Sequence, residues 1–128
     1  MNEAGAVKNF RELLVWQKGM ALANEVYRLT NSFPPDERFG LIAQLRRAAV
    51  SVPSNIAEGQ ARQSTREFLQ FLSHASGSIA EVETQLLLSV DLGYCERAIT
   101  STAFGLIIEL QKMMPALRSR SLEGIASH

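Results

Sequence analysis

The residue types that most often carry chemistry are few in this chain of 128 residues, which has two histidines and one cysteine. A Ser-His-Asp or Cys-His unit would have to use His74, because His128 lies in the polar tail. His74 and Cys95 are better explained as surface or packing residues. Glu-x-x-His pairs, phosphate-binding glycine loops and His-Glu-x-x-His helices are absent from the sequence. We therefore expect no catalytic site, no metal site, no cofactor and no enzyme activity.

Polar side chains recur at helical spacing along two segments. One line consists of Gln44, Arg47, Ser51, Asn55 and Glu58, and the other of His74, Ser78, Glu81 and Gln85. Spacings of three and four residues place each line on one face of a helix. If the lines face each other, Arg47 could pair with Glu81 while Asn55 and Ser78 bond nearby backbone groups. Two solvated faces or a ligand site are the alternatives, and spacing alone does not choose among the three.

Basic residues form local groups although the chain is neutral overall, with 13 Lys and Arg against 13 Asp and Glu. Zero net charge gives no overall field for a nucleic-acid backbone, so a nucleic-acid role would depend on a local patch. Phosphate contacts need only a few cations, and the candidates are Arg46, Arg62, Arg66, Lys112, Arg118 and Arg120. No aromatic residues alternate with these arginines as a stacking platform would require, and ordinary surface charge is the alternative.

The elements that must position these residues are four helices. Apolar residues recur every three or four positions in four segments, no strand pattern competes, and turn formers separate the segments. The helices are expected from about Phe10 to Asn31, from Asp36 with an interruption near Pro53, from Ser64 to Gly93, and from Ile99 to Leu117. Short breaks favour an all-α fold, an antiparallel up-down-up-down four-helix bundle, over a long coiled coil. The bundle is expected at residues 10–118, between a flexible segment at 1–9 and a frayed tail at 119–128.

The chain carries more apolar surface than one bundle needs, since 46% of its residues are hydrophobic. The expected core stripe of the first helix is Leu13, Trp16, Met20, Ala23 and Tyr27, and that of the fourth is Ile99, Ala103, Leu106, Leu110, Met113 and Leu117. Other apolar residues lie off these stripes, and they are either scattered surface residues or a subunit interface. The candidate interface is Val15, Leu22, Val26, Leu29, Leu88, Phe104 and Ile108. We expect a symmetric homo-oligomer.

Composition favours a single globular domain outside the membrane. No run approaches the roughly 18 apolar residues of a membrane span, and the first residues are too polar for a secretion signal. A single cysteine excludes an internal disulfide and fits a reducing compartment. We expect a cytoplasmic protein.

Several motifs between Phe10 and Tyr94 carry a family resemblance. They are Phe10-Arg11-Glu12-Leu13, Trp16-Gln17-Lys18, Phe33-Pro34 with Glu37, Gln44-Leu45-Arg46-Arg47-Ala48, Phe68, Phe71-Leu72, Ala75-Ser76-Gly77-Ser78 with Glu81, Leu92-Gly93-Tyr94 and, most specifically, Ser51-Val52-Pro53-Ser54-Asn55-Ile56-Ala57-Glu58-Gly59. In these motifs the chain resembles the small bacterial four-helix-bundle proteins that are encoded within intervening sequences of 23S ribosomal RNA genes.

The resemblance implies an antiparallel bundle that assembles into a homopentamer with no established catalytic activity. Accessory proteins of diversity-generating retroelements look similar, form pentameric rings and use a basic surface to engage a reverse transcriptase and nucleic acid. The polar lines coincide in part with the family motif, which favours a structural network over a solvated face. That network is expected to contain Gln44, Arg47, Ser51, Asn55, Glu58, Ser78 and Glu81.

The expected function is that of a non-enzymatic, homo-oligomeric scaffold or binding protein, associated with RNA or a nucleic-acid-handling protein through local basic patches. The alternative is a protein-only adaptor whose ring binds another polypeptide without nucleic acid. In both hypotheses the function depends on a binding surface and not on a catalytic centre.

Overall fold

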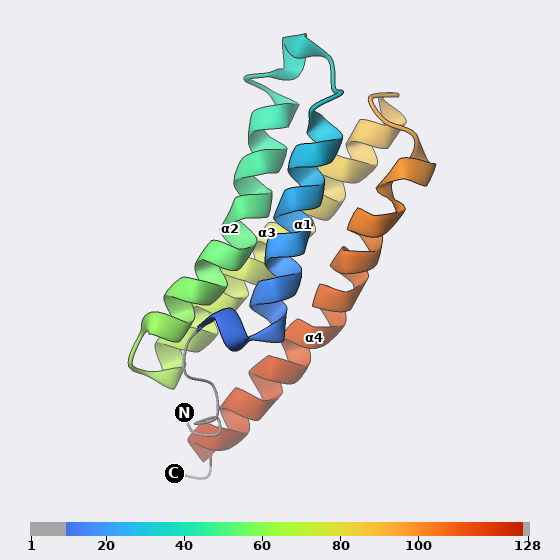
Figure 1. The fold of residues 1–128 in the computed structure, drawn as a ribbon. Coiled ribbons are helices and arrows are strands. Elements are labelled where there is room, and N and C mark those ends of the chain that lie inside the picture. The colour runs from blue at the N-terminus through green and yellow to red at the C-terminus, as the bar shows by residue number, and fades with distance from the viewer. Residues whose placement is uncertain (1–9, 127–128) are drawn as a thin grey trace.

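The computed structural model describes residues 10–126 as four α-helices joined by short connections (Figure 1). The helices are α1 Leu14–Thr30, α2 Leu41–Ala61, α3 Thr65–Asp91 and α4 Ser101–Ala126, and short 3-10 helices lie at Phe10–Glu12, Pro35–Glu37 and Arg97–Thr100. This part of the chain contains no strand. The all-α fold predicted from the sequence is confirmed.

Each helix packs against two others, so that the bundle has four sides. α1 and α3 each pack on both α2 and α4. On α2 and α3, Gln44 contacts Gln85 and Ser51 contacts Ser78, so these two helices run in opposite directions. Figure 1 shows the direction alternating from each helix to the next. The α1–α2 side therefore lies opposite the α3–α4 side.

The core side of α1 is not the stripe expected from the sequence. Its buried apolar residues are Val15, Leu22, Val26 and Leu29. In the expected stripe, Met20 and Tyr27 are exposed, and the other three residues are half-buried. The assignment of Val15, Leu22, Val26 and Leu29 to a subunit interface is thus corrected, because these side chains fill the chain's own core. Burying Tyr27 would take its hydroxyl out of water, whereas Leu22 and Val26 bury only hydrocarbon.

The buried face of α4 also differs from the expected one. α4 buries Ala103, Ile107, Leu110 and Met114, so only Ala103 and Leu110 of the expected stripe are fully buried. Thr100 is buried in the 3-10 helix that precedes α4. Ile99 is exposed, and Leu106, Met113 and Leu117 are half-buried. α4 continues to Ala126, so residues 119–126 are helical instead of forming a frayed tail. The expected flexible segment at 1–9 and residues 127–128 lie outside the described part of the chain.

Pro53 does not interrupt α2, contrary to the expectation from its missing N–H. Two contacts stabilise the proline turn. Asn55 Nδ2 donates to the Ser51 carbonyl at 2.8 Å. Gly19 lets α1 approach closely, because a Cβ there would lie 3.2 Å from Val52 Cγ1 and 3.4 Å from Pro53 N. Packing between the helices therefore keeps this turn helical.

The ends of α3 follow the predicted local signals. Ser64 Oγ accepts a hydrogen bond from the Glu67 N–H at 3.1 Å, as expected of an N-cap. At the other end Gly93 has φ 79°, a conformation that favours glycine. The Tyr94 N–H then donates to the Ser89 carbonyl at 2.9 Å, which closes the helix.

α2 begins at Leu41 rather than at Asp36, and Glu37 connects its start to the α3–α4 connection. Glu37 Oε1 accepts from the Leu41 N–H at 2.9 Å, and Oε2 accepts from the Tyr94 hydroxyl at 2.7 Å. These bonds, the Leu41 bond first, hold the pKa of Glu37 below its ordinary value. The same contact with Glu37 raises the pKa of Tyr94.

The change Tyr94→Phe is expected to make stability less sensitive to acid. Because the pKa of Glu37 is lowered in the folded chain, its contribution is present above the unfolded value of about 4.3 and is lost as the pH falls through the folded value. Removing the Tyr94 hydroxyl removes one cause of this lowering. Urea unfolding at several pH values between about 7 and about 3 should therefore show a smaller acid loss than in the parent, and Glu37→Gln should show a still smaller one. Equal acid losses in all three chains would contradict the prediction.

Candidate functional site

The two polar lines of the sequence face each other across the α2–α3 pair. The hydroxyls of Ser51 and Ser78 are hydrogen-bonded to each other. Asn55 Nδ2, in addition to its bond to the Ser51 carbonyl, lies 3.3 Å from Ser51 Oγ. Ser78 is buried, and Ser51 and Asn55 are half-buried. These three residues form a compact polar network between the two helices.

The outer members of the two lines remain at the surface. Arg47 and Glu81 border the same hollow, but no ion pair joins them in the described chain, which corrects the expected pairing. Gln85 Nε2 donates to Gln44 Oε1 over a long 3.5 Å. Among residues 10–126, the Oε1 of Gln85 is buried without a hydrogen-bond partner. Arg47, Glu81 and the Oε1 of Gln85 are thus polar groups for which the described residues supply no ion pair or hydrogen bond.

The two lines border two adjoining depressions, which we together call the α2–α3 groove. Its wider part has a volume of about 640 Å³ and is lined by Ser51, Asn55, Phe71, Ser73, His74, Gly77, Ser78 and Glu81. Its narrower part, of about 250 Å³, is lined by Gln44, Arg47, Ala48, Ser51, Glu81 and Gln85. The two parts share Ser51 and Glu81. The wider part is open to solvent, and its volume lies within the range of small-molecule sites.

A second depression, the α1–α2 groove, lies on the neighbouring side of α2. It has a volume of about 360 Å³ and is lined by Trp16, Met20, Ala23, Asn24, Tyr27, Val50, Pro53, Ser54 and Ala57. Most of these side chains are apolar. Several belong to the stripe that the sequence assigned to the core, so the apolar residues of this stripe form a surface.

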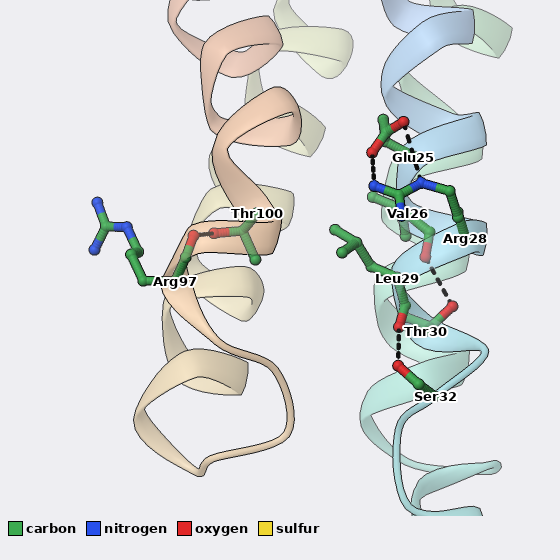
Figure 2. Close-up of polar contacts among 8 residues, drawn as sticks. All are labelled: Glu25, Val26, Arg28, Leu29, Thr30, Ser32, Arg97 and Thr100. Carbon is green, nitrogen blue, oxygen red and sulfur yellow. Dashed lines mark hydrogen bonds and ion pairs between the residues drawn. The ribbon is translucent and has the colours of Figure 1, made fainter.

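Arg46, a predicted nucleic-acid contact, is engaged inside the chain. Its Nε donates to Thr30 Oγ1 at 2.8 Å, and its Nη2 donates to Asn31 Oδ1 at 3.1 Å. The guanidinium lies 4.5 Å from the centroid of the Tyr27 ring. Thr30 in turn donates to the Val26 carbonyl at 2.8 Å (Figure 2). Arg46 thus joins α2 to the C-terminal end of α1, where a cation is favourable, and its nucleic-acid contact stays a prediction.

Two other predicted basic contacts lie beside the α2–α3 groove. Arg62 pairs with Glu58 at 2.8 Å, and its guanidinium lies 5.0 Å from the centroid of the Phe71 ring. Arg118 Nη1 donates to Ser73 Oγ at 3.0 Å from α4. Spacing along the sequence does not predict the stacking between Arg62 and Phe71, because the two residues lie on opposite sides of the α2–α3 turn. An alternation of aromatic and basic residues along one segment is visible in a sequence, whereas this contact joins two different segments.

The remaining basic candidates are Arg66, Lys112 and Arg120. All three are exposed, and none makes an ion pair with another described residue. They are available to a partner but are not brought together by any contact in the described chain.

The residues considered for catalysis do not form a unit. His74 is exposed, with its ring centroid 5.9 Å from that of Phe71. Cys95 is buried in the α3–α4 connection, and burial raises the pKa of its thiol, which disfavours the reactive thiolate. Within residues 10–126, no three His, Cys, Asp or Glu side chains gather in a way that could hold a metal ion. The described helices also include none with the length and apolar character of a membrane span.

Four amphipathic helices around one core, with two grooves beside α2, place this chain in the class of small helical-bundle proteins. The model of the 23S rRNA-intervening sequence protein family matches residues 11–116, and the chain therefore belongs to this family. The resemblance drawn from the sequence motifs is confirmed. A search of curated proteins finds no match to the chain.

Proposed function

We propose that this protein is a non-enzymatic, self-associating scaffold whose chains meet through the α1–α2 groove. The supporting observation is the exposure of apolar side chains in that groove: Met20 is 39% exposed, Tyr27 44% and Val50 42%. An apolar surface that a chain does not cover itself is typical of a protein interface. The neutral charge of the chain also removes a long-range repulsion between copies.

A second copy offers a matching surface on the opposite side of the bundle. Gln111 on α4 bonds Glu83 on α3, which marks the α3–α4 edge. Ile108 lies one turn from Gln111 and is 51% exposed, and Leu87 lies one turn from Glu83 and is 40% exposed. Half-buried Phe104 continues this surface. We call these three apolar residues the α3–α4 surface.

Contact between the α1–α2 groove of one chain and the α3–α4 surface of the next is head-to-tail. Such a contact repeats around an axis and closes into a ring when the rotation permits. A closed ring of five chains is the assembly that the family resemblance implies, and we adopt it. Of the predicted interface residues, Phe104 and Ile108 fit this arrangement, and Leu88 is exposed beside it. A buried free thiol suits a reducing compartment, which supports a cytoplasmic location.

The change Met20→Glu is expected to dissociate the assembly. Light scattering of the parent should give about five times the 14.1 kDa of one chain, and the variant should give one chain at micromolar concentration, because a carboxylate would be desolvated in the interface. Trp16, the one tryptophan, lines the groove, so its emission should shift to the red on dissociation.

Phe39→Glu is the matched control, since Phe39 is 87% exposed and lies outside both surfaces. It should leave the mass unchanged. A parent mass of one chain would overturn self-association and favour the adaptor reading, in which the groove binds a different polypeptide. Dissociation by Phe39→Glu but not by Met20→Glu would mean that the interface includes Phe39 and not the α1–α2 groove.

A further inference from the structure

The wider part of the α2–α3 groove has a floor without a side chain at Gly77. Gly77 is exposed in the middle of α3, and a Cβ added there would meet no atom within 4 Å. A glycine inside a helix is less stable than alanine, so this position carries a cost. By contrast, Gly19 and Gly59 allow close helix contacts, with neighbours 3.2 Å and 2.8 Å from an added Cβ. The packing of this chain therefore does not require Gly77, and its effect is to leave the groove open.

Hydrogen-bonding groups surround this bare turn. His74 and Glu81 lie three residues before and four residues after Gly77, on the same face of α3. Helical side chains lean toward the N-terminus, which directs the Glu81 carboxylate over the turn of Gly77. Across the groove, Asn55 uses its Nδ2 within the protein, and no donor among the described residues reaches its Oδ1. The groove thus offers two acceptors to a ligand that carries N–H groups.

Aromatic and cationic groups lie toward one end of the groove. The rings of Phe71 and His74 meet edge to face, and the guanidinium of Arg62 lies over Phe71. Arg118 donates to Ser73, which lines the groove one turn before Gly77. Ser73 and Gly77 are four residues apart, which is about 6 Å along the helix and the scale of the separation between a base and its 5′ phosphate. Arg62 is already paired with Glu58, so Arg118 is the cation that can receive an anion at this end, while the turn of Gly77 can receive a flat ring.

We propose that the α2–α3 groove binds a nucleotide, with the base over Gly77 and the phosphate beside Arg118. The Glu81 carboxylate accepts from the exocyclic amino group of the base, which selects adenine over uracil because uracil presents carbonyl oxygens in its place. The same carboxylate repels an acidic peptide, the other ligand that the arginines could attract. Arg118 supplies a charge-assisted hydrogen bond to phosphate. The site lies within one chain and does not depend on the proposed ring.

Calorimetric titration of the full chain tests this site with AMP, UMP, adenosine and inorganic phosphate. AMP should bind about tenfold more tightly than UMP, the ratio expected when one base-edge contact is lost. AMP should also bind more tightly than adenosine, and phosphate alone should bind more weakly than AMP. Single-stranded octamers A8 and U8 distinguish the source of the nucleotide. A8 binding at least tenfold more tightly than AMP assigns the site to a strand, and equal affinities assign it to a free nucleotide.

Gly77→Leu is the decisive variant, because it adds a side chain to the bare turn, where the added Cβ meets no atom within 4 Å. It should reduce AMP affinity at least tenfold and leave the thermal transition unchanged or higher. Gly105→Leu is the matched control, since Gly105 is an exposed glycine of α4 whose added Cβ also meets nothing within 4 Å. It should bind AMP like the parent. Arg118→Ala should remove the difference between AMP and adenosine, and Glu81→Gln the difference between AMP and UMP.

Three results would overturn the site. They are absence of saturable AMP binding by the parent, unchanged affinity in Gly77→Leu, and equal losses in Gly77→Leu and Gly105→Leu. Saturable binding of a glutamate-rich peptide with no binding of AMP would also reject it and assign the groove to a protein. None of these results depends on the mass of the assembly.

Discussion

Replacing Leu22 with alanine is expected to lower the free energy of unfolding by about 2–5 kcal/mol, because it leaves a cavity in the core. Leu22 is fully buried on the inner face of α1, between α2 and α4. The loss has two parts, the transfer of the removed methyl groups and the space that the helices cannot close. Urea unfolding followed by circular dichroism measures it.

Met20→Ala is the matched control, since Met20 lies two residues earlier but opens into the α1–α2 groove. Its cost within one chain should stay below about 1 kcal/mol, as for surface substitutions. Any further cost should grow with protein concentration, because only the assembled form would lose that contact. A small, concentration-dependent effect of Leu22→Ala with a large effect of Met20→Ala would mean that Met20 lies in the core and Leu22 at the interface, as first expected from the sequence.

The number of helices and the ends of α3 could be predicted from the sequence because their signals are local. The Ser64 N-cap needs only the Glu67 N–H three residues later. The turn at Gly93 needs only a residue that tolerates positive φ. Neither signal depends on the rest of the fold.

The orientation of α1 could not be predicted in the same way, because both of its stripes are apolar. Periodicity gives the angle between the stripes but does not say which one meets the other helices. A similar limit applies at Pro53. Its local cost predicts an interruption, whereas contact with Gly19 on another helix stabilises the unbroken turn. Tertiary packing outweighs local preference at both places.

In the candidate site, too, the contacts that follow from helical spacing could be predicted, and those that depend on tertiary packing could not. Spacing placed Ser51 and Asn55 on one face of α2 and Ser78 on one face of α3, and these residues do meet. The arginines were harder to interpret, because their partners lie on other segments. Arg46 binds the end of α1, and Arg62 stacks on a ring of α3. A list of cations in a sequence does not separate those used inside the fold from those left for a partner.

Gly59 is expected to be the most sensitive to substitution of the glycines whose contacts the structure describes. A Cβ at this position would lie 2.8 Å from Phe71 Cβ and 3.2 Å from Phe68 Cδ1, where α2 and α3 approach near their shared turn. Phe71 Cβ is fixed to the α3 backbone, so a rotamer change cannot relieve the overlap. Gly59→Val should therefore lower the free energy of unfolding by about 3 kcal/mol, a cost typical of overpacking.

Gly77→Val is the matched control, since it makes the same change on an exposed helical turn with no neighbour within 4 Å of the added Cβ. Its unfolding free energy should stay within about 0.5 kcal/mol of the parent, as for other surface substitutions. If Gly59→Val does not fold, Gly59→Ala gives a smaller measurable loss, because the Cβ alone produces the overlap. Equal stability of the Gly59 and Gly77 variants would mean that α2 and α3 do not approach at Gly59. A loss confined to Gly59 separates a glycine required by packing from one that keeps a groove open.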